Sequence, residues 1–317
     1  MFIEVPLRTT LRLGLAVLAS SLATTVRAQD ASPWQRSGHS AVRLLAGSHS
    51  GSVLLGGIAM QLESGWKTYW RNPGDSGVPP RFDFSKSENI EAVTVLWPAP
   101  TKFDDGAGGY SLGYHNQIVL PLRIVAKNAD RPVTLRADIN YAVCEKLCIP
   151  VEANAELSFA SVASTEDGAL SAALDTVPKP ASIGDPNPLT IRDVKRAGKA
   201  TVLVDVVAPD TGTVSLFVEG PTPDWGLPIP KQIEHSPPGV KRFTFELDGL
   251  PPGAKPEGAA AGFLSAQLGL PVAGQSLAQR KTMNIPLELL LHRPQAIRRQ
   301  LEQRRSAGQL LLPVSTY

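Results

Sequence analysis

The sequence has only two cysteines among its 317 residues, few aromatic residues and almost no net charge. Aromatic residues make up 6% of the chain and the formal net charge is +2. Lys and Arg are scattered until the last stretch, so the chain lacks the clustered basic surface of nucleic-acid-binding proteins. No run reaches the roughly 20 apolar residues that a membrane-spanning helix needs. We therefore expect no nucleic-acid partner and no transmembrane span.

The N-terminus has the pattern of a secretory signal peptide. Arg8 and Arg12 precede the apolar run "LGLAVLASSLA", and "VRAQ" follows it with a small-residue cleavage site after Ala28. The alternative, an uncleaved membrane anchor, is disfavoured because the run is too short to cross a bilayer. We expect export to the periplasm, where disulfides persist.

Residues 38–160 have the pattern of an antiparallel β-sheet protein. The segment "PVTLRADINYAVC" places Leu135, Ile139 and Val143 on one face, and "IPVEANAELSF" alternates in the same way from Val151 to Phe159. Strict alternation of apolar and polar residues is typical of half-buried strands. Several such short strands bounded by Gly, Pro and Asp predict an immunoglobulin-like sandwich.

The remainder of the chain predicts a second, smaller sandwich. Residues 161–188 allow one short helix and a turn-rich linker, and strand patterns resume up to about residue 250. The fold class expected is all-β, with two tandem immunoglobulin-like sandwiches and a partly helical, basic tail. The expected boundaries are a signal peptide at 1–28, a first sandwich at 29–165, a linker at 166–188, a second sandwich at 189–290 and a tail at 291–317.

Both cysteines lie in the segment "YAVCEKLCIP", between two predicted strands. The simplest geometry is a hairpin with residues 145–147 at its tip and Cys144 opposite Cys148. Directly opposed residues lie about 4.5 Å apart at Cα in a non-hydrogen-bonded pair, which is close enough for a disulfide. A disulfide is therefore feasible without disturbing the fold.

Three interpretations of the cysteine pair remain open at this point. As a structural staple it would contribute little, on the order of 2 kcal/mol, because so short a loop restricts the unfolded chain only slightly. A zinc site needs more ligands than two thiolates, although Cu(I) accepts two. An exchangeable disulfide fits best, because a short exposed disulfide is easily reduced. Lys146 would stabilise the thiolate of such a pair, and Glu145 would oppose it.

Three ordered motifs resemble the periplasmic N-terminal region of the DsbD and ScsB family of thiol:disulfide interchange proteins, with ScsB the closer likeness. They are "GWKTYWRNPGDSGVPP", "WPAPTKFDDGAGGYSLGYHNQIVLPL" and "INYAVCEKLCIP", within about residues 38–165. The resemblance implies that Cys144 and Cys148 form a redox couple, with Cys148 bonding to the client in the mixed disulfide. It also implies a cap or docking role for six residues: Tyr69, Trp70, Phe103, Asp104, Asp105 and Tyr110.

The resemblance further implies a function for the whole chain. It would pass electrons from a membrane reductase to thioredoxin-fold periplasmic proteins, with no metal and no organic cofactor. The family's fused membrane region and its C-terminal thioredoxin domain are missing from this sequence. We therefore expect a separate membrane electron donor, or a truncated relative that has lost this role. The competing hypothesis is an immunoglobulin-like binding module, with a part in assembly or copper tolerance, whose disulfide is structural.

Overall fold

The structure is a computed structural model and describes most of the chain between residues 29 and 286. The described residues are 29–104, 106, 108–198, 200–210, 213–220, 225–234, 236–253, 263–269 and 282–286. The expected signal peptide and basic tail lie outside them. Within them the chain forms nineteen strands and one α-helix, which confirms the all-β fold class. No helix in this part of the chain is long and apolar enough to cross a membrane.

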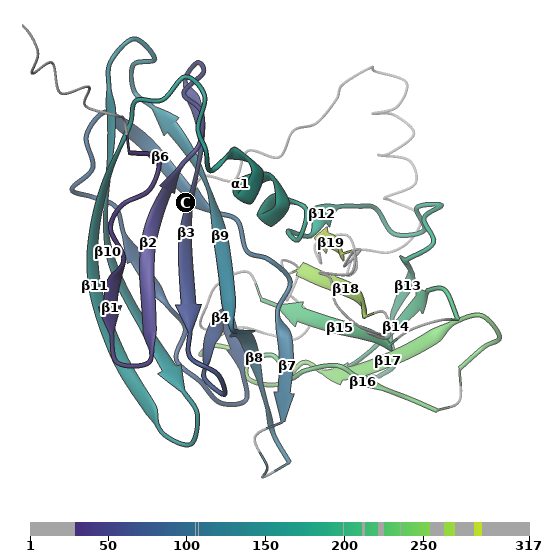
Figure 1. The fold of residues 1–317 in the computed structure, drawn as a ribbon. Helices are drawn as coiled ribbons and strands as arrows, with labels where there is room; N and C mark the ends of the chain where they lie inside the picture. The colour runs from purple at the N-terminus through teal and green to yellow at the C-terminus, as the bar shows by residue number, and fades with distance from the viewer. Residues whose placement is uncertain are drawn as a thin grey trace, which may run out of the picture.

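The first sandwich, on the left in Figure 1, consists of two antiparallel sheets. One sheet has the order β1-β2-β3-β9-β6. Its strands are β1 (Gln35–Ser37), β2 (Ser40–Ala46), β3 (Val53–Leu62), β9 (Gln117–Ala126) and β6 (Ile90–Val95). The other has the order β11-β10-β4-β8-β7, with β5 also paired to β10. Its strands are β11 (Cys148–Phe159), β10 (Val133–Cys144), β4 (Lys67–Gly74), β8 (Tyr110–His115), β7 (Thr101–Asp104) and β5 (Arg81–Asp83).

The core of this sandwich follows from the alternation in the sequence. Along β10 the buried side chains include Leu135, Ile139 and Val143, and along β11 every second residue from Val151 to Phe159 is buried. The intervening residues of β11 are exposed. Because side chains of a strand point alternately to its two faces, each strand contributes one row to the core. The predicted inward face of β10 and the predicted inward and outward faces of β11 are confirmed.

The second sandwich, on the right in Figure 1, consists of two four-stranded sheets, β12-β19-β18-β15 and β13-β14-β17-β16. The short helix α1 (Asp167–Leu174) precedes it. Its strands are β12 (Lys179–Pro180), β13 (Thr190–Arg196), β14 (Thr201–Val207), β15 (Thr213–Glu219), β16 (Lys231–Gln232), β17 (Lys241–Glu246), β18 (Phe263–Gly269) and β19 (Thr282–Pro286). β12 lies in the segment expected to be a linker and pairs in parallel with β19.

The two sandwiches contact each other where β4 meets β15. The Trp70 and Phe217 rings lie 6.1 Å apart between centroids. Beside them, Arg71 donates two hydrogen bonds of 2.7 and 2.6 Å to the Glu219 carboxylate. Phe217 belongs to the core cluster of the first sandwich although it comes from a strand of the second. The two units therefore share part of one core.

Candidate functional site: a disulfide at a hairpin end

The two cysteines face each other at the end of the β10–β11 hairpin. Cys144 is the last residue of β10, Cys148 is the first of β11, and the two are direct partners in the ladder. They form a disulfide, with their Cα atoms 4.2 Å apart. The predicted hairpin, its tip at residues 145–147 and the feasibility of a bond between the cysteines are confirmed.

The two cysteines differ strongly in exposure. Cys144 is 2% exposed, whereas Cys148 is exposed. The sheet order explains the difference, because β10 is an interior strand flanked by β4, whereas β11 is the edge strand. Cys144 packs in a small cluster with Tyr69 and Ala142. Of the two cysteines, Cys148 is therefore the one on the solvent side of the disulfide.

Tyr69 is the aromatic side chain that contacts the disulfide. Its hydroxyl oxygen lies 3.3 Å from the Cys148 Sγ atom. Because a disulfide sulfur carries no proton, the hydroxyl must be the donor in this contact. Burial of the ring raises the pKa of Tyr69 above its ordinary value, since a phenolate would be poorly solvated there. The hydroxyl therefore stays protonated at neutral pH and can donate to a sulfur that carries negative charge.

The Tyr69 ring is covered by the chain that follows β4. A Cβ atom built at Gly77 would lie 2.5 Å from both Cδ1 and Cε1 of Tyr69, so no larger residue fits against the ring. Gly77 also has a φ of 143°, which L side chains rarely adopt. Sequence reasoning missed this residue. The only signal for it was the pair of glycines in "NPGDSG".

A polar cluster lies on the same face of the sheet. Lys67 is the ladder partner of Cys144, and its Nζ atom donates a 2.9 Å hydrogen bond to the buried Ser111 Oγ. The same ammonium lies 5.2 Å from the centroid of the Phe103 ring, and Phe103 contacts the His115 ring edge to face. Phe103 therefore shares this face with the cysteines, at the far edge strand of the sheet. Neither Lys67 nor Ser111 was anticipated from the sequence.

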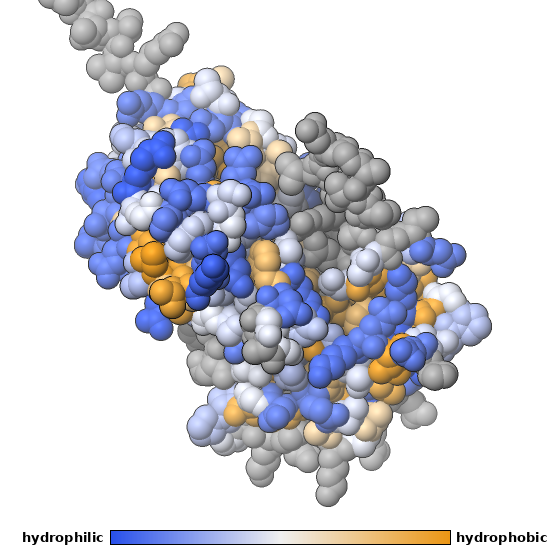
Figure 2. All heavy atoms as spheres, turned by 60° about the horizontal axis from the view of Figure 1, so that its bottom comes forward, coloured by the Kyte–Doolittle hydropathy of each residue, from blue (hydrophilic) through white to orange (hydrophobic). Residues whose placement is uncertain are grey.

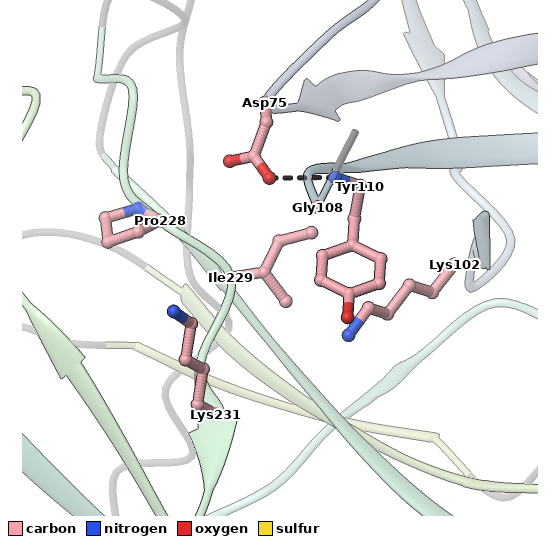
Figure 3. Close-up of a pocket in the computed structure, with 7 residues that line it drawn as sticks. All are labelled: Asp75, Lys102, Gly108, Tyr110, Pro228, Ile229 and Lys231. Atoms are coloured by element: carbon pink, nitrogen blue, oxygen red, sulfur yellow. Dashed lines mark hydrogen bonds between the residues drawn. The ribbon is translucent and has the colours of Figure 1, made fainter. Parts of the chain in front are cut away.

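The other predicted cap residues lie elsewhere. Tyr110 lines a cavity of about 130 Å³ between the two sandwiches, where Asp75, Lys102 and Ile229 surround it (Figure 3). Asp104 is exposed, and its side chain accepts a hydrogen bond from the Gly106 amide. The structure does not bring these two residues to the disulfide.

Two further predicted residues need separate mention. Trp70 is buried in the core on the opposite face of β4 from Tyr69, and it contacts Phe217 rather than the cysteines. Asp105 lies outside the described residues. Of the six residues expected around the pair, the structure thus brings Tyr69 into contact with it and places Phe103 on the same face.

Cys148 lies between two exposed apolar residues in the chain, close to the exposed Glu145 and Lys146 of the hairpin tip. Leu147 and Ile149, its two neighbours in the chain, are 79% and 37% exposed, and Val78, next to Gly77, is 51% exposed. Figure 2, which brings the bottom of Figure 1 forward, shows hydrophobic residues among hydrophilic ones on this side of the molecule. Within the part of the chain that the structure describes, no group of three or more metal-ligating side chains occurs.

The fold and the site together define an immunoglobulin-like domain with a two-cysteine disulfide at the end of one hairpin. Residues 41–160 match the family described as "Thiol:disulfide interchange protein DsbD, N-terminal". The first sandwich therefore matches a DsbD-type N-terminal domain.

Comparison with solved structures agrees at the level of the fold. The N-terminal periplasmic domain of ScsB from Proteus mirabilis superposes with a TM-score of 0.61 at 18% identity, over 82% of this chain and 98% of that one. A conserved domain protein from Bacillus anthracis gives a TM-score of 0.20 at 10% identity, over 80% and 88% of the two chains, a likeness too low for any argument. No curated protein matches the chain.

Proposed function

We propose that this protein exchanges thiols and disulfides with protein partners in the periplasm, through Cys144 and Cys148. It accepts two electrons from a separate membrane reductase and passes them to thioredoxin-fold clients. The observation that carries the proposal is the pairing of one exposed and one buried cysteine in a single disulfide. The domain family and the periplasmic origin of the ScsB domain support it.

The exposure of the sulfurs gives the order of events. To load the pair, a donor thiolate attacks Cys148 Sγ, the Cys144–Cys148 bond breaks, and Cys144 leaves as the thiolate and takes up a proton. A second donor thiolate then attacks the donor sulfur of the mixed disulfide. The donor ends as a disulfide, and Cys148 is released as a thiol. The pair has then gained two electrons and two protons.

Reduction of a client runs through the same exposed sulfur. The Cys148 thiolate attacks the client disulfide, a bond forms between Cys148 and one client sulfur, and the other client sulfur leaves as a thiolate. The Cys144 thiolate then attacks Cys148 Sγ, which restores the disulfide and releases the second client thiol. The two protons of the pair pass to the two client thiols. No organic cofactor takes part, because the sulfurs themselves carry both electrons.

Tyr69 stabilises the negative charge that develops on the Cys148 sulfur during exchange. Its protonated hydroxyl is already 3.3 Å from Sγ in the oxidised protein. Charge-assisted hydrogen bonds are about twice as strong as neutral ones, so the contact stabilises a Cys148 thiolate more than the disulfide. The same donor favours departure of Cys148 from a mixed disulfide.

The surface around Cys148 suits a partner with its own apolar surface. Leu147, directly before Cys148 in the chain, is 79% exposed at the hairpin tip and offers an apolar contact. Thioredoxin-fold proteins are the partners that we propose for this surface.

A redox titration tests the proposal directly. The Cys144–Cys148 couple is expected to have a reduction potential above about −300 mV, the level below which structural disulfides usually lie. Equilibration with glutathione mixtures, followed by quenching and alkylation, measures it. A reduction potential below about −300 mV would contradict the proposal. The remaining interpretation would then be an immunoglobulin-like binding module with a structural disulfide.

Trapping provides the second test and carries its own control. Cys144→Ser leaves the exposed sulfur without its resolving partner, so a disulfide-linked adduct with a thioredoxin-fold client should accumulate. Cys148→Ser leaves only the buried sulfur and should give almost no adduct. Equal adduct yields from the two variants would contradict the assigned order of attack.

A further inference from the structure

The cysteine site and the second sandwich meet on three consecutive residues of β4. Tyr69 contacts Cys148, Trp70 contacts Phe217, and Arg71 pairs with Glu219. Since side chains of a strand alternate between its faces, β4 presents Tyr69 to the disulfide and Trp70 to the shared core. A displacement of this short stretch therefore moves the residue that touches the exposed sulfur.

The backbone of β4 has few ladder partners at this point. The ladders pair Lys67, Thr68 and Tyr69 with β8, and Lys67 and Thr68 with β10. The β4–β8 pairing then resumes only at Gly74, after an irregularity. Residues 70–73 therefore have no paired residue in either neighbouring strand. Because backbone pairing is missing there, we infer that side-chain contacts hold this stretch in place.

The second sandwich supplies those contacts from one face of β15. On this strand Val214, Leu216 and Val218 belong to the core of the second sandwich. The opposite face presents Phe217, 2% exposed and part of the first core, and Glu219. β15 therefore serves two cores, one on each face.

The ion pair between the sandwiches is bidentate and mostly buried on the Glu219 side. The Glu219 side chain is 10% exposed, and the Arg71 Nε and Nη2 atoms each donate to one carboxylate oxygen. A bidentate pair fixes the relative orientation of its two groups as well as their distance. Because the carboxylate is buried, loss of one partner leaves the other without compensation.

We propose that Phe217 and Glu219 form a clamp that positions Tyr69 against Cys148. The clamp holds β4 from the second sandwich, and its effect on thiol reactivity passes through the Tyr69 hydroxyl. Phe217, Glu219 and Arg71 are positioning residues, since none of them contacts a sulfur. This assignment rests on the proposed function, because it gives the second sandwich a part in the reactivity of the same pair.

The test compares two chemically matched substitutions in the full chain. With Cys144→Ser as background, Glu219→Gln should slow alkylation of Cys148 by iodoacetamide at pH 7 about tenfold. This is less than the roughly hundredfold loss of rate that a 1 Å misplacement of reacting groups causes in an enzyme. Asp205→Asn is the control, because Asp205 forms the same bidentate pair with an arginine inside the second sandwich. The control should leave the rate within about twofold.

A double-variant cycle separates positioning from general loosening. In a Tyr69→Phe background, Glu219→Gln should cause no further slowing, because the hydroxyl on which it acts is gone. Phe217→Leu, a change that keeps most of the apolar volume, should slow alkylation in the same direction. Additive effects of the Tyr69 and Glu219 substitutions, or equal slowing by the Asp205 control, would overturn the clamp.

Hydrogen exchange gives a readout that needs no partner protein. Amides of residues 69–80 should exchange faster in Glu219→Gln than in wild type, and unchanged exchange there would also overturn the clamp. Should the wild-type protein fail to react with any thioredoxin-fold client, the proposed function fails. The alkylation cycle and the exchange data still decide the clamp in that case.

Discussion

Replacement of Tyr69 by Phe removes one hydroxyl and little else. The hydroxyl oxygen lies 3.3 Å from Cys148 Sγ, and the ring that carries it is buried beneath Gly77. Phe keeps that ring, so the packing against Gly77 survives the substitution. The change therefore isolates the hydrogen bond to sulfur.

The size of the effect follows from the charge that the bond stabilises. Hydrogen bonds to charged groups contribute about 1.5–3 kcal/mol, and the lower end applies because Cys148 is open to solvent. Since about 1.4 kcal/mol equals one pH unit, the midpoint of the thiol alkylation profile should move up by about one unit. Below the midpoint, the alkylation rate should fall about tenfold.

The assay is alkylation of reduced protein across pH, with Cys144→Ser as background so that Cys148 is the one thiol. Tyr141→Phe is the matched control, because Tyr141 is also buried in the first sandwich and its hydroxyl bonds to Ser40 at 2.8 Å rather than to sulfur. An unshifted profile for Tyr69→Phe, or an equal shift for Tyr141→Phe, would refute the role given to Tyr69.

Three more predictions concern packing, docking and acid stability. Gly77→Ala should lower the free energy of unfolding by about 1–3 kcal/mol, because the added Cβ meets the Tyr69 ring. Gly108 also has a positive φ but has open space around it, so Gly108→Ala should lower that free energy less. Urea unfolding measures both. Leu147→Ser should slow exchange with a thioredoxin-fold client without lowering Tm, while Val162→Ser, 86% exposed, should not slow it. The pKa of Asp205 is lowered below 3.8 by hydrogen bonds from its arginine partner, so its contribution is present above pH 3.8 and disappears as the pH falls through the lowered pKa. Between pH 6 and pH 2, the free energy of unfolding measured in urea should therefore fall less for Asp205→Asn than for wild type. An equal fall in the two proteins would contradict this.

The sequence predicted those parts of the site that depend on local pattern. Alternation along residues 132–144 and 149–159 predicted two strands, their inward faces and a three-residue tip, and all of these are confirmed. A period of two is a strong signal because half-buried strands show it directly. The position of the cysteines in the hairpin followed from the same pattern.

The remaining features depend on contacts between residues far apart in the sequence. The unequal exposure of Cys144 and Cys148 follows from which strand lies at the sheet edge, and pairing order has no local signal. Gly77 lies on Tyr69 because the chain folds back after β4, and Phe217 reaches Trp70 from 147 residues further along. Motif resemblance placed Tyr110 near the disulfide as a cap, whereas it lines the cavity between the sandwiches.

The hairpin tip separates the surface that a partner protein meets from the ladder that holds the two cysteines opposite each other. Glu145, Lys146 and Leu147 are exposed, and the β10–β11 ladder that they connect pairs Cys144 with Cys148. Substitutions in this triplet alter what an approaching protein meets, while the strands keep the sulfur geometry unchanged. Selection can therefore change the choice of partner at Leu147 without altering the charges of Glu145 and Lys146 or the ladder that pairs the two cysteines.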